Sequence, residues 1–135
     1  MSTSIDSAVP NVVVVDPRFD AYKQLADSAR LGRINLHIRS GGADALKLAR
    51  RGAVDAWLIA ADLDDMSGND LVELLRTRAA DAKVAMVETD APGSRRHAVA
   101  ETEASASGAD TVLTHPITLR DLEDLLGLPA EERTK

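Results

Sequence analysis

Two carboxylates and an imidazole follow predicted strands of this chain, and they are the side chains best suited to chemistry. Asp16 follows the run Asn11-Val12-Val13-Val14-Val15, Glu88 ends a second apolar segment and His115 follows a third. Because functional groups gather at the carboxyl ends of parallel strands, we expect these three residues at one edge of a sheet. They could form a histidine–carboxylate pair or a cation site. Since ion-pair networks also hold such groups together, the structural interpretation is favoured.

An acidic segment later in the chain superficially resembles a calcium-binding loop. Its acidic residues are Asp62, Asp64, Asp65, Asp70 and Glu73. In such a loop Asp62, Asp64, Asp70 and Glu73 would stand at positions 1, 3, 9 and 12. Position 5 would then be Met66, and position 6 would be Ser67 where the turn requires glycine. We therefore expect a solvated acidic loop whose charges favour the start of the following helix, without a metal.

Other kinds of catalytic site find no support in the sequence. The absence of cysteine excludes thiolate metal sites and disulfides. No serine lies in a nucleophile-elbow motif. Gly41-Gly42 opens a helix, but no glycine-rich phosphate-binding motif follows it. We therefore expect a protein that is not an enzyme and holds no cofactor.

Strands and helices must alternate to position these residues. Continuous or alternating apolar runs predict strands over residues 11–15, 34–38, 54–61, 83–88 and 111–113. Apolar residues at helical spacing, beginning with Phe19, Tyr22 and Leu25, predict helices over residues 19–32, 45–52, 71–75, 94–107 and 119–126. Thr118 is the expected cap of the last helix. Strict alternation indicates a parallel sheet with helices on both faces, which is a three-layer α/β architecture.

Composition fits one domain and limits its partners. The chain has 135 residues, 44% of them hydrophobic, and a formal net charge of −6. An acidic chain is poorly suited to bind nucleic acid, because phosphates require clustered Lys and Arg. The longest fully apolar run, residues 56–61, is too short to cross a membrane. We expect a flexible tail over residues 1–10, a domain over 11–128 and a second tail over 129–135, in the cytoplasm.

Three segments resemble the receiver domain of two-component response regulators. Val12-Val13-Val14-Val15-Asp16 resembles the family's first strand and its acidic end. Residues 55–68 fit the third strand and the following loop without a gap. Residues 108–117 are similar to the fifth-strand segment, which usually reads Gly-Ala-Asp, apolar residues and then Lys-Pro-Phe. The resemblance covers residues 11–126. It implies a flavodoxin-like, CheY-like (βα)5 fold with a five-stranded parallel sheet of order 2-1-3-4-5.

The resemblance also implies a chemistry that this sequence has largely lost. In the family, two adjacent acids on strand one and an aspartate on strand three bind Mg²⁺, and the latter aspartate accepts a phosphoryl group. A Thr or Ser on strand four and a Lys on strand five contact that group. At these positions the chain has Asp16, Pro17, Ala60, Glu88 and His115. Ala60 stands at the acceptor position, counted from Asp55 or from Gly68. Only Asp16 matches.

The favoured functional hypothesis is a degenerate receiver, or pseudo-receiver, that acts in two-component or phosphorelay signalling by phosphorylation-independent protein–protein interaction. A receiver switch using Asp16 and Asp62 as its cation or phosphoryl site is an alternative, although Asp62 lies roughly 6–7 Å beyond Ala60 along an extended strand. A small-ligand binder at the carboxyl edge of the sheet is another. The partner is expected to be a protein, and a homodimer stays open.

Further expectations follow from the resemblance and the composition. Arg95, Arg96 and His97 begin the fourth predicted helix, and Val112 replaces the family's aromatic switch residue, so these residues are the candidate partner surface. Arg50-Arg51 is the other basic cluster. The His115–Pro116 peptide is expected to be cis, as the family's Lys–Pro bond usually is. The fourth helix, rich in Ala and Ser, is expected to be the least stable.

Overall fold

Five parallel strands form one sheet in the computed structural model, which describes residues 9–51, 54–77, 82–88, 108–114 and 117–127. The strands are β1 (Asn11–Val15), β2 (Asn35–Arg39), β3 (Ala56–Ala60), β4 (Lys83–Glu88) and β5 (Thr111–Thr114). Their order in the sheet is β2-β1-β3-β4-β5, and every neighbouring pair is parallel. The predicted flavodoxin-like order 2-1-3-4-5 is therefore confirmed.

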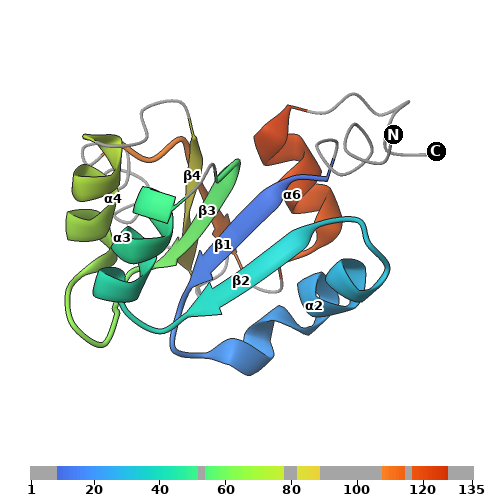
Figure 1. The fold of residues 1–135 in the computed structure, drawn as a ribbon, viewed down its shortest axis with the longest axis horizontal. Coiled ribbons are helices and arrows are strands. Elements are labelled where there is room, and N and C mark those ends of the chain that lie inside the picture. Colours follow the sequence, from blue (N-terminus) through green and yellow to red (C-terminus); the bar gives the residue numbers. More distant parts are fainter. Residues whose placement is uncertain (1–8, 52–53, 78–81, 89–107, 115–116, 128–135) are drawn as a thin grey trace.

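Helices cover both faces of this sheet. The described helical elements are the 3₁₀ turn η1 (Phe19–Tyr22), α2 (Lys23–Arg30), α3 (Gly42–Arg51), α4 (Gly68–Arg76) and α6 (Leu119–Leu126). Helices α3 and α4 lie on one face, and α2 and α6 lie on the other (Figure 1). None of the described helices has the length and apolar character needed to span a bilayer. The predicted fourth helix, and its expected low stability, lie outside the described residues.

Alternating side chains of the central strands build two cores. Val13 and Val15 of β1 pack with α3 and α4, whereas Val12 and Val14 pack with α2 and α6. Every residue of β3 is buried as well. This burial on both faces explains why β1 and β3 are continuous apolar runs, as parallel strands in the middle of a sheet require. In contrast, β2 is an edge strand with alternating exposure, as predicted.

The first predicted helix needs correction. A single helix over residues 19–32 with Phe19 on its apolar face was expected, but the chain forms η1 first and the α-helix begins only at Lys23. Tyr22 and Leu25 are fully buried, whereas 53% of Phe19 is exposed. The tighter winding of a 3₁₀ turn shifts the side-chain direction, which takes Phe19 out of the helical stripe.

The last helix begins as predicted. Thr118 and Asp121 form a reciprocal capping box, in which the Thr118 hydroxyl accepts from the Asp121 N–H and the Asp121 carboxylate accepts from the Thr118 N–H. Two otherwise unpaired backbone donors are thereby satisfied. Helix α6 ends at Gly127, whose φ of 77° lies in the left-handed region that glycine adopts without steric cost.

Arg76 at the end of α4 joins three segments of the fold. Its Nε donates to the Gly108 carbonyl and one terminal nitrogen donates to the Ala82 carbonyl, each at 2.7 Å. The other terminal nitrogen lies 2.9 Å from Asp110, whose carboxylate also accepts the Val84 N–H at 2.8 Å. A single guanidinium therefore ties α4 to the beginnings of β4 and β5.

We predict that Arg76→Ala lowers the free energy of unfolding by about 2–4 kcal/mol, because it leaves two carbonyls and a carboxylate without their charged donor. Arg50→Ala is the matched control. Arg50 is exposed on α3, and its removal should change stability by no more than about 0.5 kcal/mol. Urea unfolding followed by the fluorescence of Trp57, the chain's single tryptophan, measures both. Equal effects would contradict a structural role for Arg76.

Candidate functional site

The carboxyl ends of the strands form the edge where the candidate residues were expected. Asp16 directly follows β1, and Ala60 is the last residue of β3. Ala60 pairs with Val87, and the next residue of β4, Glu88, pairs with Thr114. The strand register therefore brings the backbones of these positions to one edge. The Glu88 side chain and His115 lie outside the described part of the structure, so the proposed contact of both with Asp16 stays a prediction.

Asp16 is a buried carboxylate with internal partners. It has no exposed surface, although it follows the last residue of a strand. The Tyr22 hydroxyl donates to its Oδ2 at 2.7 Å, and the Arg18 N–H donates to its Oδ1 at 2.9 Å. The Arg18 guanidinium lies 3.4 Å from the same Oδ1. Because a buried charge is tolerated only when paired and hydrogen-bonded, these contacts allow Asp16 to remain in the core.

Tyr22 is the site residue that the sequence did not reveal. Its position in the apolar pattern predicted a core residue, and its ring does pack with Leu25 and Leu122. Its hydroxyl has a second role, because it donates to Asp16. Burial, the hydrogen bond to Asp16 and the negative charge of Asp16 all raise the pKa of Tyr22, while the charge of Arg18 opposes them. Tyr22 therefore stays protonated and able to donate at any pH near neutrality.

Ala60 is enclosed by the loop that follows it. Its residue surface is 1% exposed. The Gly68 N–H donates to the Ala61 carbonyl at 2.7 Å, and a Cβ on Gly68 would lie only 2.0 Å from the Ala60 carbonyl oxygen. Glycine is thus required at position 68 for the loop to fold back onto the end of β3. The loop therefore folds directly onto the backbone at the end of β3, where the Ala60 side chain offers no nucleophile.

The acidic loop after β3 caps a helix, but this helix is not the one that was expected. The Asp65 carboxylate accepts the N–H groups of Gly42 and Ala43, at 2.7 and 3.0 Å, and so caps α3, the preceding helix. These backbone donors lower the pKa of Asp65. The following helix, α4, is capped by the Ser67 hydroxyl, which accepts from the Asp70 N–H. The acids of this loop were expected to favour the start of the following helix, α4. Asp70 does lie in the first turn of α4, but the cap is Ser67, and Asp65 caps the preceding helix instead.

The described part of this edge has few side-chain ligands for a divalent cation. Pro17 and Ala60 offer no side-chain ligand atom, and both carboxylate oxygens of Asp16 already accept hydrogen bonds. The Arg18 guanidinium supplies positive charge at this point. Asp62 is exposed and its backbone pairs with Ser67. Within the described residues, no group of three or more acidic or histidine side chains is arranged to hold a metal ion, the acidic loop included.

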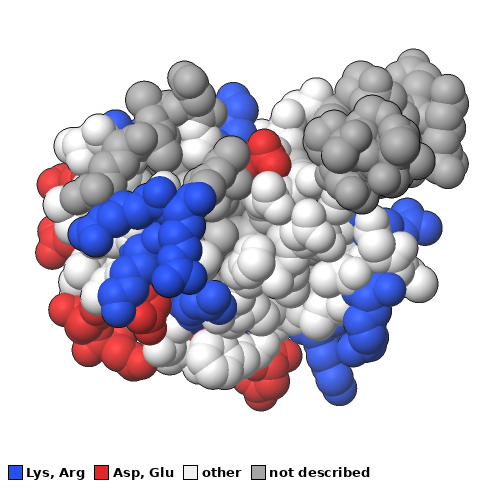
Figure 2. All heavy atoms as spheres, in the orientation of Figure 1, with Lys and Arg blue, Asp and Glu red and all other residues white. Residues whose placement is uncertain are grey.

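The expected partner surface is only partly described. Arg95, Arg96, His97 and the His115–Pro116 bond lie outside the described residues. Val112 on β5 is half-buried and packs against the core between the sheet and α4. Basic side chains do gather over α3 (Figure 2), where Lys47, Arg50 and Arg51 are exposed. Arg50 and Arg51 lie in the last turn of α3, where positive charge is favourable to the helix dipole.

We predict that Tyr22→Phe lowers stability by about 1.5–3 kcal/mol at neutral pH, because Asp16 loses a hydrogen bond to its charge while staying buried. The variant should also change how the free energy of unfolding depends on pH under alkaline conditions. Tyr22 is the only tyrosine, and its pKa of 10.0 in the unfolded chain is raised on folding. The unfolded state therefore releases the proton first, and wild-type stability falls above pH 10.

All other ionisable groups are common to the two proteins, so the difference between the two pH profiles isolates Tyr22. Stability measured from neutral pH to above pH 10 should fall more steeply for the wild type than for Tyr22→Phe. Parallel profiles would show that the Tyr22 hydroxyl is not sequestered by Asp16.

A second pair of variants tests the cap on α3. We expect Asp65→Ala to destabilise the protein because the N–H groups of Gly42 and Ala43 lose their acceptor. Asp64→Ala, one residue earlier and also exposed, should leave stability unchanged. Because the Asp65 pKa is lowered by folding, its contribution is present above the ordinary value of 3.8 and lost as the pH falls below it. Circular dichroism during thermal unfolding compares the two variants.

Comparison with solved structures identifies the fold of this chain, whereas comparison of its sequence identifies no family. No family model matches the chain, and no curated protein matches it. Solved structures do match. A CheY-like response regulator receiver domain protein from Methanospirillum hungatei superposes with a TM-score of 0.71 at 20% identity, over 93% of this chain and 97% of that one.

Two other matches are described with ligands of their own. A response regulator protein from Burkholderia pseudomallei, with a phosphorylated aspartic acid, a calcium ion and citrate, has a TM-score of 0.73 at 22% identity, over 93% of this chain and 71% of that one. The receiver domain of the sensor histidine kinase PA1611 from Pseudomonas aeruginosa, with magnesium in its active-site cleft, has a TM-score of 0.69 at 16% identity, over 88% and 95%. The chain therefore has the fold of response-regulator receiver domains.

Proposed function

We propose that this chain is a pseudo-receiver, a signalling module that works by binding proteins and does not accept a phosphoryl group. Its fold is that of receiver domains, including one with a phosphorylated aspartate and one with magnesium. The module is proposed to act in two-component signalling, in the cytoplasm, through contacts of the domain itself and without enzymatic activity. The domain spans residues 11–128 in this proposal, with tails on either side.

The observation that carries this proposal is the buried Ala60 at the end of β3. The resemblance places the phosphoryl acceptor at this position, and an alanine methyl cannot act as a nucleophile. Ala60 itself lies in the last register pair of β3 with β4, and its carbonyl is in close contact with Gly68, which supports this assignment. A shift of one residue along the strand would therefore have to break both of these contacts.

The state of Asp16 supports the same conclusion. In an active receiver, the acids of strand one would face a metal ion. Here Asp16 accepts hydrogen bonds from Tyr22 and Arg18, and the guanidinium stands close to the carboxylate. The charge is offset within the fold, so no cation is needed for stability. The remaining acid of the site has become a structural group.

The alternative switch that uses Asp62 has less support. Asp62 lies two residues beyond the end of β3 and is exposed, whereas Asp16 is fully buried behind Tyr22. A phosphoryl group on Asp62 would have no described metal site beside it. The small-ligand hypothesis at this edge stays a prediction.

Treatment with acetyl phosphate and Mg²⁺ tests the proposal directly. Intact-mass spectrometry should show no phosphoryl adduct on the wild type. Ala60→Asp should not restore normal labelling, because Pro17, Glu88 and His115 still withhold a metal ligand, a hydroxyl donor and a permanent cation. Groups that act as a unit are not repaired one at a time.

Asp62→Asn is the control that separates the two hypotheses. An adduct on the wild type that disappears in Asp62→Asn would establish the alternative switch and overturn the pseudo-receiver. An adduct that maps to Asp16 would do the same. An unlabelled wild type, together with a labelled receiver domain treated in parallel, is the result that the proposed function requires.

A further inference from the structure

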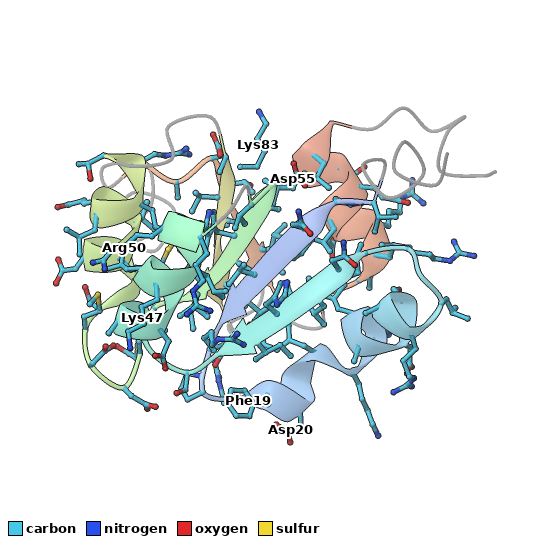
Figure 3. All side chains as sticks on the ribbon, in the orientation of Figure 1. Phe19, Asp20, Lys47, Arg50, Asp55 and Lys83 are labelled. Atoms are coloured by element: carbon cyan, nitrogen blue, oxygen red, sulfur yellow. The ribbon has the colours of Figure 1, made fainter. Side chains whose placement is uncertain are left out.

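Helix α3 presents exposed positive charge, although the chain as a whole is acidic. Its basic side chains gather on one face of the molecule (Figure 2), whereas the formal net charge of the chain is −6. Lys47 and Arg50 lie along this helix (Figure 3), and Lys47 is 3.9 Å from Asp44. Within the described part of the chain, the guanidinium groups of Arg50 and Arg51 have no ion-pair or hydrogen-bond partner. The C-terminal end of α3 therefore carries two cations that the fold itself does not use.

The acidic loop after β3 is attached to the other end of this helix. Asp65 caps the start of α3, and the Asp64 N–H donates to the Ser40 carbonyl at 3.5 Å. The side chains of Asp62 and Asp64 are exposed, and among the described residues neither carboxylate has a hydrogen-bond or ion-pair partner. Two free anions are thus held by the loop backbone beside the N-terminal end of α3.

These opposite charges are separated along the helix and do not neutralise each other within one molecule. Helix α3 has 10 residues, so it is about 15 Å long. This length exceeds the Debye length of about 8 Å at physiological ionic strength, so salt screens most of the attraction between its two ends. Figure 2 shows acidic side chains gathered below the basic ones on the same face. We call this surface, positive at one end of α3 and negative at the other, the α3 face.

A second copy of this chain matches the charges of the α3 face. When two α3 helices lie antiparallel about a two-fold axis, the basic end of each faces the acidic loop of the other, and the same contact is made twice. An isologous interface of this kind requires a single self-complementary patch. We propose that this chain forms a symmetric dimer through the α3 face, in which Arg50 and Arg51 of each molecule pair with Asp62 and Asp64 of the other.

The middle of the proposed interface places no unpaired charge against its own copy. Lys47 lies near the midpoint of α3 and would approach its counterpart in the second molecule, but each is offset by Asp44 of its own helix. Exposed ion pairs contribute little individually, so we expect an association that is weak and sensitive to salt. This inference rests on the proposed function, since it names a second copy as a protein partner of a module that binds proteins.

Sedimentation velocity over a range of protein concentrations tests the dimer. At low salt the weight-average sedimentation coefficient of the wild type should rise with concentration, and at high salt it should return to the monomer value. Arg50→Glu combined with Arg51→Glu should weaken association by about tenfold or more, because like charges then face each other. Lys23→Glu combined with Arg33→Glu is the matched control. It makes the same change in net charge at exposed positions outside the α3 face, and should leave association unchanged.

A charge-swap experiment identifies the two sides of the contact. Asp62→Lys combined with Asp64→Lys should also abolish self-association, since its loop then repels the basic end of α3. Mixed with the variant that carries Arg50→Glu and Arg51→Glu, it should form a heterodimer, because opposite charges again meet at both copies of the contact. Arg50→Ala, which removes a charge without reversing it, should weaken association of the otherwise unchanged protein in the same direction.

The outcomes are separable from those of the phosphorylation test. A wild type that stays monomeric at low salt and high concentration would overturn the α3 dimer, as would self-association that the control variant weakens as much as the arginine variants do. Failure of the two charge-reversed variants to pair when mixed would do so as well. None of these results concerns acetyl phosphate labelling, which alone decides the proposed function.

Discussion

The burial of one negative charge organises the carboxyl edge of this protein. Asp16 has no exposed surface, and an isolated buried carboxylate would be too costly to keep in the core. The Tyr22 hydroxyl and the Arg18 backbone and guanidinium remove that cost. Both groups come from the segment that joins β1 to α2, so Asp16 is linked to that segment on either side of Phe19. The same contacts occupy both of its carboxylate oxygens.

Similar polar contacts stabilise the opposite end of the sheet, where the strands begin. Asp55 accepts the Asn11 N–H at 2.8 Å, and Asp110 accepts the Val84 N–H while Arg76 neutralises its charge. These side chains satisfy backbone donors within the first two residues of β1 and β4. Both ends of the sheet are therefore stabilised by groups within the fold, and the receiver architecture is compatible with a buried alanine at the end of β3.

Much of the architecture could be predicted from local patterns. The valine run of β1 and the apolar residues of β3 are continuous because both faces of a central parallel strand are covered. Strict alternation of elements indicated the layers, and resemblance in three segments gave the strand order. The cap by Thr118 was also predictable, since an N-cap and its partner lie only three residues apart. At the site, the position of Ala60 at the end of β3 could be predicted because it is counted within one continuous segment.

What the sequence determined by itself was therefore the five strands, most of the described helices and the two apolar faces of the inner strands, since each depends on residues close together in the chain. Tertiary structure alone decided which polar groups meet. Asp65 caps a helix whose first residue is 23 positions away, and Arg76 reaches a carbonyl 32 positions away. Tyr22 is only six residues from Asp16, yet the pair forms because a 3₁₀ turn replaces the expected α-helical turn. Such contacts depend on loop paths and on the stacking of helices across the sheet, which no local periodicity encodes.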